Sequence, residues 1–282
     1  MNRLILLFAI LLLGACAPAA RPPIAPMPVV AAQSLDLPAA NGRKVPLTIW
    51  RAPAQRGVIL FGHGLGGQPS RYEALIDRWV AHGYSVVAPL SVDSMAYADR
   101  DKYDLQAGFR ARVEDLMIAR GYIAAAFPGQ KVALAGHSYG SLFALIGAGA
   151  ITPAGALKGP PVAAVLTFSS PGAVPQLVTD STYASVAAPL LMITGDKDVV
   201  PGFVADAAAH RLPFDRSPAG NKMLVTVTGG AHDLVVHGDA ATTAALARLT
   251  LEYLDTWLAG SPVARKALAA ERSTASYRIE RR

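Results

Sequence analysis

At residues 131–141 the chain reads K-V-A-L-A-G-H-S-Y-G-S. The first five residues are an apolar run typical of a buried strand, and the pattern from Ser141 onward is helical. Between them lies a G-x-S-x-G pentapeptide, Gly136–Gly140. A serine on such a sharp turn stands exposed above the sheet, because the flanking glycines lack the Cβ atoms that would clash. The helix that follows directs its dipole at the serine and favours developing negative charge. We therefore predict that Ser138 is a catalytic nucleophile.

Short β-branched runs alternate with helical patterns along the chain from residue 35 onward. The predicted strands are Val45–Trp50, Val58–Phe61, Tyr84–Leu90, Lys131–Ala135, Val162–Phe168, Leu190–Thr194 and Met223–Thr228. Only about 20 residues separate the strands at 162–168 and 190–194, too few for a folded cap domain. Strands that alternate with helices in this way predict an α/β protein with a mostly parallel sheet covered on both faces.

Two further stretches carry an acid and a base that a serine nucleophile needs. Residues 193–201 read I-T-G-D-K-D-V-V-P and place two candidate acids, Asp196 and Asp198, just after an apolar strand. Residues 227–234 read V-T-G-G-A-H-D-L, where a glycine pair lets the loop with His232 fold back over the serine. His237 is the competing base, but it lies farther from the strand and lacks this context. The residues alone leave both aspartates open as the acid.

A fourth stretch, F-G-H-G-L-G-G at residues 61–67, follows the strand Val58–Phe61. Together the four stretches resemble the α/β-hydrolase superfamily of serine hydrolases, whose triad follows the chain order Ser, Asp, His. The resemblance extends from about residue 35 to residue 260. It implies the α/β-hydrolase fold, with a mostly parallel central sheet, helices on both faces and no large cap domain.

The resemblance also implies roles for individual residues. The family places the acid three residues after the glycine of the third stretch, which selects Asp198 and leaves the other aspartate as a turn residue. In the implied triad, His232 takes the proton of Ser138 while Asp198 fixes the histidine tautomer and stabilises the imidazolium. The backbone N–H groups of Leu65 and Tyr139 are the implied oxyanion hole.

Within the superfamily, the chain is similar to one branch. F-G-H-G-L-G-G followed after one helix by A-H-G-Y-S-V-V-A-P, residues 81–89, resembles platelet-activating-factor acetylhydrolases, dienelactone-hydrolase-like esterases and bacterial polyester hydrolases. Dienelactone hydrolases have a cysteine nucleophile where Ser138 stands. Polyester hydrolases carry a tryptophan in the loop before the acid and a disulfide near the C-terminus. Residues 169–188 hold no tryptophan, and the chain has a single cysteine.

The expected function is hydrolysis of carboxylic esters with short to medium acyl groups through an acyl-enzyme. We expect no cofactor and no metal site, and the expected substrate is a small-molecule or lipid ester. An acyltransferase, or a polyester or phospholipid acyl hydrolase, on the same triad remains an alternative. A catalytically silent envelope binding protein is an alternative from a different class.

The other histidines are expected to have no catalytic role. His63 is interpreted as holding its loop by hydrogen bonds, and His137 as a wall residue beside the nucleophile. His82, His210 and His237 are interpreted as solvated loop residues.

The N-terminus has the features of an export signal. Leu4–Leu13 is an apolar run behind Arg3, too short for a bilayer span of about 20 residues but suited to a signal-peptide core. The run ends in L-G-A-C, residues 13–16, which resembles the bacterial lipoprotein signal that is lipidated on the cysteine. Cys16 is therefore the predicted lipidation site and membrane anchor, and an ordinary secretory signal is the alternative.

The predicted organisation is a signal peptide at 1–15, a Pro/Ala-rich tether at 16–34, a hydrolase domain at 35–260 and a basic tail at 261–282. The tail is expected to be a frayed surface segment. The predicted location is the bacterial cell envelope, anchored to the outer membrane and facing the periplasm. A composition of 52% hydrophobic and 16% charged residues excludes a disordered protein.

The net charge of +6 is concentrated near the C-terminus. Residues 265–282 hold six basic and two acidic residues, so the rest of the chain is nearly neutral. A nearly neutral body argues against nucleic acid as a partner.

Overall fold

The computed structural model describes residues 31–157 and 159–282. The predicted signal peptide, Cys16 and most of the predicted tether lie outside these residues. Within the described part of the chain, no helix is both long enough and apolar enough to cross a bilayer.

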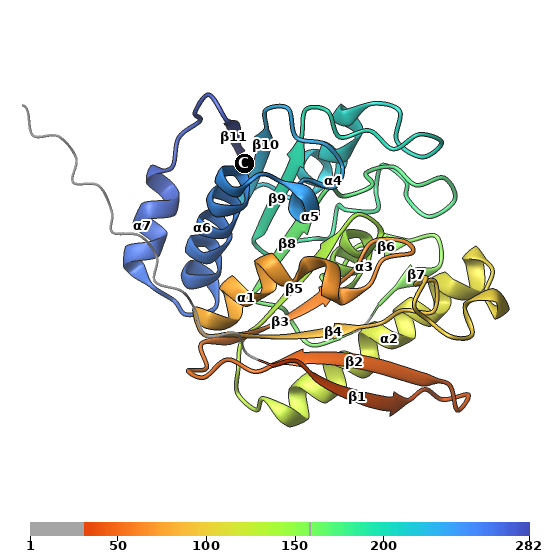
Figure 1. Ribbon diagram of the computed structural model, residues 1–282. Helices are drawn as coiled ribbons and strands as arrows, with labels where there is room; N and C mark the ends of the chain where they lie inside the picture. The colour runs from red at the N-terminus through yellow and green to blue at the C-terminus, as the bar shows by residue number, and fades with distance from the viewer. Residues whose placement is uncertain (1–30, 158) are drawn as a thin grey trace, which may run out of the picture.

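One nine-stranded sheet forms the centre of the molecule (Figure 1). Its strands in spatial order are β1 (Gln33–Pro38), β2 (Lys44–Trp50), β4 (Tyr84–Pro89), β3 (Gly57–Gly62), β5 (Val132–His137), β8 (Ala164–Phe168), β9 (Leu190–Gly195), β10 (Lys222–Val227) and β11 (Tyr277–Arg281). The strands from β4 to β10 are parallel, whereas β1, β2 and β11 pair antiparallel to their neighbours. A separate hairpin pairs β6 (Ile151–Thr152) with β7 (Gly155–Ala156).

Helices cover both faces of this sheet (Figure 1). They are η1 (Pro69–Tyr72), α1 (Glu73–Ala81), η2 (Arg100–Lys102), α2 (Leu105–Ala126), α3 (Tyr139–Gly147), η3 (Ala207–Arg211), α4 (Leu212–Arg216), α5 (Leu234–His237), α6 (Ala240–Trp257) and α7 (Pro262–Ala270). Trp79 of α1 and Tyr253 of α6 belong to one core, and Phe109 of α2 and Leu142 of α3 to the other. The mostly parallel α/β architecture predicted from the sequence is therefore confirmed.

Strand β3 shows why the sheet has two cores. Ile59 and Phe61 pack into the core under α1 and α6, whereas Val58 and Leu60 pack into the core under α2 and α3. Successive side chains of a strand point to opposite faces, so a strand that is buried on both faces must be apolar throughout. The parallel strands end at one edge of the sheet, and the loops after β3, β5, β9 and β10 meet there.

The C-terminal segment is folded onto the domain, so the expectation of a frayed tail is wrong. Strand β11 pairs with β10 along its whole length, and α7 packs beside α6. Glu271 lies 2.7 Å from a guanidinium nitrogen of Arg248, and the Tyr277 hydroxyl donates to the same carboxylate at 2.6 Å. The polar composition of this segment gave no sign of a strand, because an edge strand needs apolar side chains on one face only. At the other end, β1 begins at Gln33, two residues before the predicted start of the domain.

Deletion of residues 261–282 should lower the melting temperature by more than about 5 °C, because it removes a paired strand and exposes the edge of β10. Thermal unfolding followed by circular dichroism measures the change. The control is Arg272→Ala, an exposed position in the same segment, which should leave the melting temperature within about 1 °C. A truncated protein that melts at the wild-type temperature would contradict the folded role of this segment.

Candidate active site

Ser138 lies on a strained turn between β5 and α3. Its backbone has φ 52° and ψ −123°, a conformation that residues other than glycine rarely adopt. Two hydrogen bonds lock the turn: Ser138 N–H donates to the carbonyl of Phe168 at 2.8 Å, and Ser141 N–H donates to the carbonyl of Ser138 at 2.9 Å. A Cβ atom at Gly140 would overlap the carbonyl of Gly62 at the end of β3. Glycine is therefore required where α3 crosses this strand.

The structure brings Ser138, His232 and Asp198 together in one hydrogen-bonded line. His232 Nε2 lies 2.9 Å from Ser138 Oγ, and His232 Nδ1 lies 2.7 Å from Asp198 Oδ1. Asp198 is 0% exposed, and its Oδ2 accepts a hydrogen bond of 2.7 Å from the Thr194 hydroxyl. The three side chains come from the loops after β5, β9 and β10, which the parallel sheet places at one edge.

The competing residues occupy other positions. Asp196 turns toward the loop of His232, where its Oδ1 accepts a hydrogen bond of 2.8 Å from Gly229 N–H. The side chain of His237 is 62% exposed, and its Nε2 lies 4.0 Å from Asp233. Asp196 thus stabilises the backbone of the histidine loop, and His237 lies on the surface.

His210 lies in the site, so its interpretation as a solvated loop residue is wrong. It is 0% exposed, and its Nε2 lies 2.8 Å from Asp198 Oδ1. Its Nδ1 contacts the carbonyl of Ser170, and its ring stacks on that of His232 with centroids 5.8 Å apart. An alanine run precedes His210 in the sequence and an arginine follows it. Such neighbours give no local indication of a role in the site. Only the fold, which returns η3 to the end of β9, brings His210 into contact with Asp198.

These contacts explain why Asp198 is ionised. Burial opposes the negative charge of this carboxyl, but hydrogen bonds from His210 and His232 outweigh the burial and hold its pKa well below the usual value. A carboxylate that stays charged can hold an Nδ1–H tautomer of His232 and stabilise an imidazolium.

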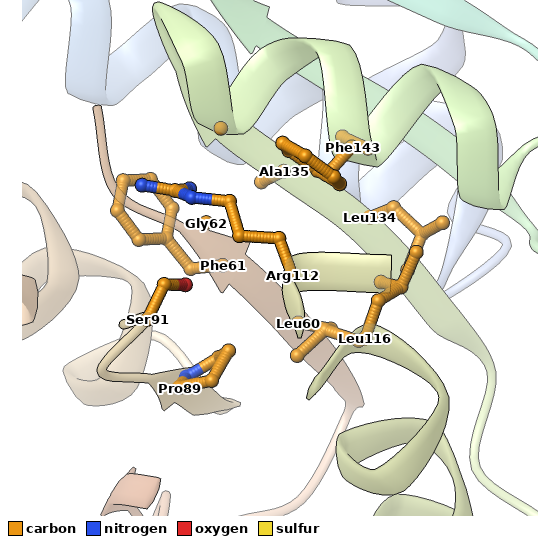
Figure 2. Close-up of a pocket in the computed structure, with 12 residues that line it drawn as sticks. Leu60, Phe61, Gly62, Pro89, Ser91, Arg112, Leu116, Leu134, Ala135 and Phe143 are labelled. Carbon is orange, nitrogen blue, oxygen red and sulfur yellow. The ribbon is translucent and has the colours of Figure 1, made fainter. Parts of the chain in front are cut away.

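A buried ion pair between Arg112 of α2 and Asp93 holds the loop after β3. Arg112 reaches from α2 toward Phe61 and Gly62 (Figure 2), and its Nε lies 2.6 Å from Asp93 Oδ1. The same guanidinium donates to the carbonyl of His63 at 2.8 Å and to that of Gly64 at 3.2 Å. Because a guanidinium presents its donors in a rigid fork, these bonds position the loop in one geometry.

Two backbone amides beside Ser138 remain available to a bound group. In the loop Gly64–Gly67 the other three amides have acceptors: Tyr72 Oη for Gly64, Asp93 Oδ2 for Gly66 and the carbonyl of Gly64 for Gly67. Among the described residues, no acceptor is found for Leu65 N–H. Tyr139 is the first residue of α3, where amides have no partner within the helix.

Comparisons with known proteins agree with this architecture. A family model of serine aminopeptidase-type (S33) hydrolases matches residues 53–171. The esterase domain of a Rhodothermus marinus protein matches with a TM-score of 0.57 and 15% identity, over 81% of this chain and 99% of that one. A Thermus thermophilus protein matches with a TM-score of 0.56 and 19% identity, over 81% and 98% of the two chains. The chain therefore has the α/β-hydrolase fold, and part of it is similar to serine aminopeptidase-type hydrolases.

One further structural match concerns a longer protein. A puromycin-hydrolysing peptidase from Mycobacterium tuberculosis matches this chain with a TM-score of 0.63 and 16% identity. The match covers 81% of this chain but only 39% of the peptidase. No curated protein sequence matches the chain as a relative.

The α/β hydrolase has a cleft next to the two available amides, with a volume of about 420 Å³. It is lined by Leu65, Gly66, Asp93, Arg100, Asp101, Tyr103, Asp104, Leu105, Gly108 and Tyr139. Leu65 and Leu105 are 45% and 66% exposed, so apolar surface faces solvent here. The hollow in Figure 2, between α2, α3 and the central strands, has a volume of about 30 Å³ and is too small for a substrate.

The cluster of Asp198, His210 and His232 has the spacing of a metal site, since one atom from each lies within 4.8 Å of the others. However, both imidazoles are hydrogen bonded to the carboxylate between them. We therefore interpret the cluster as a hydrogen-bonded network.

Two buried neutral histidines, His63 and His137, form hydrogen bonds to the loops of the site. His63 Nδ1 donates to the carbonyl of Gly64 at 2.7 Å, and its Nε2 accepts from Ser91 N–H at 3.0 Å. His137 Nε2 donates to the carbonyl of His232 at 2.8 Å, and its Nδ1 accepts from the Tyr72 hydroxyl at 2.9 Å. Both side chains hold loops in place, which was expected for His63, whereas His137 was expected only to be a wall residue.

Burial disfavours the charged form of both histidines. Burial, followed by the charge of Arg112, lowers the pKa of His63 to about 3, and burial lowers the pKa of His137 to about 4. In the unfolded chain both residues bind a proton near the ordinary histidine value of about 6.5. Between these pH values the unfolded state holds more protons, so the free energy of unfolding falls as the pH drops.

We expect these two histidines together to contribute a fall of about 3–5 kcal/mol in the unfolding free energy between pH 6.5 and pH 4.5, at up to about 1.4 kcal/mol per pH unit for each histidine. The raised pKa of Asp115 opposes part of this fall. Urea unfolding at several pH values measures it. His63→Gln should reduce the slope, because glutamine can still accept from Ser91 but does not titrate. The exposed control His237→Gln should leave the slope unchanged. A His63→Gln variant with the same pH dependence as the wild type would contradict the assignment.

Proposed function

We propose that this α/β hydrolase cleaves carboxylic esters through an acyl-enzyme formed on Ser138. The observation that carries the proposal is the continuous hydrogen-bonded line from Ser138 Oγ through His232 to Asp198, beside two available backbone amides. Nucleophile, base and orienting acid within hydrogen-bond reach are the geometric signature of covalent acyl transfer.

The mechanism follows from the order of these contacts. His232 Nε2 takes the proton from Ser138 Oγ as the oxygen attacks the acyl carbonyl, and Asp198 stabilises the imidazolium through Nδ1–H. The N–H groups of Leu65 and Tyr139 donate to the oxyanion, where each donor is worth about 2.7–4 kcal/mol in the transition state. The imidazolium then protonates the leaving alcohol. Water attacks the acyl-enzyme by the same steps and releases the acid.

The cleft supports short or medium acyl groups. Its volume of about 420 Å³ lies in the lower part of the usual range for ligand pockets, and Leu65 and Leu105 provide apolar surface for a chain. Transfer of the acyl group to an alcohol instead of water would proceed through the same acyl-enzyme. Product analysis in the presence of an added alcohol separates the two reactions.

Amide hydrolysis is a second candidate, favoured by the match of residues 53–171 to serine aminopeptidase-type hydrolases. The same triad serves both reactions, which differ in the leaving group that His232 protonates. Parallel assays on p-nitrophenyl esters and on aminoacyl p-nitroanilides decide between them. Turnover of anilides alone would replace the ester assignment.

Substitutions of the triad test the mechanism. Ser138→Ala and His232→Ala should each lower kcat by several orders of magnitude, and the double variant should be little worse, because triad members act as a unit. Asp198→Asn should lower kcat by about 10⁴, through the wrong tautomer of His232. The measurement is single-variant kinetics on a p-nitrophenyl ester, with melting temperatures recorded to exclude unfolding.

Two neighbouring substitutions are the matched controls for this series. Asp196→Asn and His237→Ala should retain kcat, since neither side chain contacts the line of hydrogen bonds. Full activity in Ser138→Ala, or in Asp198→Asn, would overturn the assigned roles. Wild-type protein that neither turns over esters nor reacts with a fluorophosphonate would favour the catalytically silent alternative.

We also propose that the enzyme is a lipoprotein of the cell envelope, anchored through Cys16. The support is the L-G-A-C sequence at residues 13–16 and the proline-rich segment that follows it. In a bacterial host, Cys16→Ser should move the protein from the membrane fraction to the soluble fraction or leave its precursor unprocessed. Metabolic labelling with a fatty acid should mark the wild type only. Unchanged fractionation together with an unlabelled wild type would exclude the anchor.

A further inference from the structure

The surroundings of His210 determine its protonation state. Nε2 lies 2.8 Å from Asp198 Oδ1 and 2.9 Å from the backbone carbonyl of the same residue, and Nδ1 contacts the carbonyl of Ser170. Each of these oxygens can only accept a hydrogen bond, because a carbonyl has no proton and Asp198 is ionised. Both ring nitrogens must therefore donate, which requires a proton on each of them. His210 fits its site only as an imidazolium.

The charges around His210 are consistent with this state. Asp198 is the carboxylate in direct contact, and the ring of His232 stacks on the ring of His210 with centroids 5.8 Å apart. The neighbouring guanidinium of Arg211 is directed away, into ion pairs with Asp215 and Glu280. Burial would lower the pKa of His210, but the hydrogen bond and charge of Asp198 outweigh burial and raise it above the ordinary histidine value.

We propose that His210 is a positioning residue of the active site. It is a buried imidazolium that shares the Asp198 carboxylate with His232, and it thereby sets the orientation of this carboxylate and its effective negative charge. The proposal rests on the proposed function, since it assigns His210 a role in the same reaction. Oδ1 of Asp198 accepts from both rings, at 2.7 Å from His232 and 2.8 Å from His210. Without the His210 donor, Oδ1 is held by His232 alone, while Oδ2 keeps its hydrogen bond from Thr194.

The shared carboxylate has an electrostatic consequence. The positive charge of His210 partly cancels the negative charge of Asp198, so the carboxylate attracts a positive charge on His232 less strongly than in a triad with one histidine. Removal of the charge at His210 should therefore shift the acid side of the pH–activity profile to higher pH.

Two substitutions separate the hydrogen bond of His210 from its charge. His210→Gln places an amide N–H near the position of Nε2, so it can still donate to Asp198 but is neutral. His210→Asn places its amide near Nδ1, so it can still donate to Ser170 but loses Asp198. The exposed His237→Gln is the control for loss of a histidine.

On a p-nitrophenyl ester, we expect His210→Asn to lower kcat about tenfold to a hundredfold with KM within about twofold, as for loss of a hydrogen bond to a charged group. His210→Gln should retain kcat within about fivefold, but the pH of half-maximal kcat/KM on the acid side should rise by about one unit. If both variants lower kcat equally and neither moves the pH profile, His210 has only a structural role. Wild-type kinetics in both would likewise overturn the proposal.

A second measurement tests the protonation state without any activity assay. In ¹⁵N-labelled protein at pH 8, where an ordinary histidine is neutral, both ring nitrogens of one residue should resonate in the protonated range. These signals should be absent from His210→Gln and present in His237→Gln. A His210 ring with one unprotonated nitrogen at pH 8 would overturn the assignment. Because this experiment does not depend on turnover, failure of the ester-hydrolase assignment is distinguished from failure of the His210 assignment.

Discussion

The close contact between the first turn of α3 and the end of β3 is the constraint on which the rest of the site depends. A Cβ atom at Gly140 would overlap the carbonyl of Gly62, and a Cβ atom at Gly136 would overlap the backbone of Gly140. Only glycine permits this approach, which forces Ser138 into its strained conformation with φ 52°. The same approach brings the amide of Tyr139 to the loop that carries Leu65. One backbone contact therefore positions both Ser138 and the start of α3 with its Tyr139 amide.

The strained backbone of Ser138 persists because buried hydrogen-bond networks fix the loops around it. One network runs from Gly64 N–H to the Tyr72 hydroxyl, on to His137 and then to the carbonyl of His232. It joins the loop of the available amides to the loop of the base. These groups are shielded from solvent, so a missing partner would leave a buried polar atom unsatisfied at a cost of about 1–3 kcal/mol. The cost keeps the loops in one arrangement before any substrate arrives, which is the preorganisation that oxyanion stabilisation requires.

The ion pair of Arg112 and Asp93 acts on the same loop from the opposite side. The guanidinium is nearly buried and donates to two loop carbonyls as well as to the carboxylate. Burial opposes ionisation of Asp93, but Arg112 outweighs it and lowers the pKa of this carboxyl. Breaking a buried pair costs about 3–5 kcal/mol, because the remaining charge has no partner. Together with the Tyr72–His137 network, the pair makes the loop after β3 a rigid part of the fold.

Local patterns in the sequence were sufficient for the sheet, for the serine turn and for the stretches around Asp198 and His232. These features depend on interactions between near neighbours: apolar runs that are buried on both faces, and glycines where the backbone must turn sharply. Local patterns did not indicate the strand β11 or the role of His210. Strand β11 is specified by its pairing with β10, about 50 residues earlier, and its own residues are mostly polar. His210 acquires its function from two carbonyls and a carboxylate that other loops bring to it, and the protonation state of an imidazole depends on those partners. The candidate side chains of the site were thus encoded locally, whereas the choice between the two aspartates and the orientation of the groups were decided by tertiary contacts between loops.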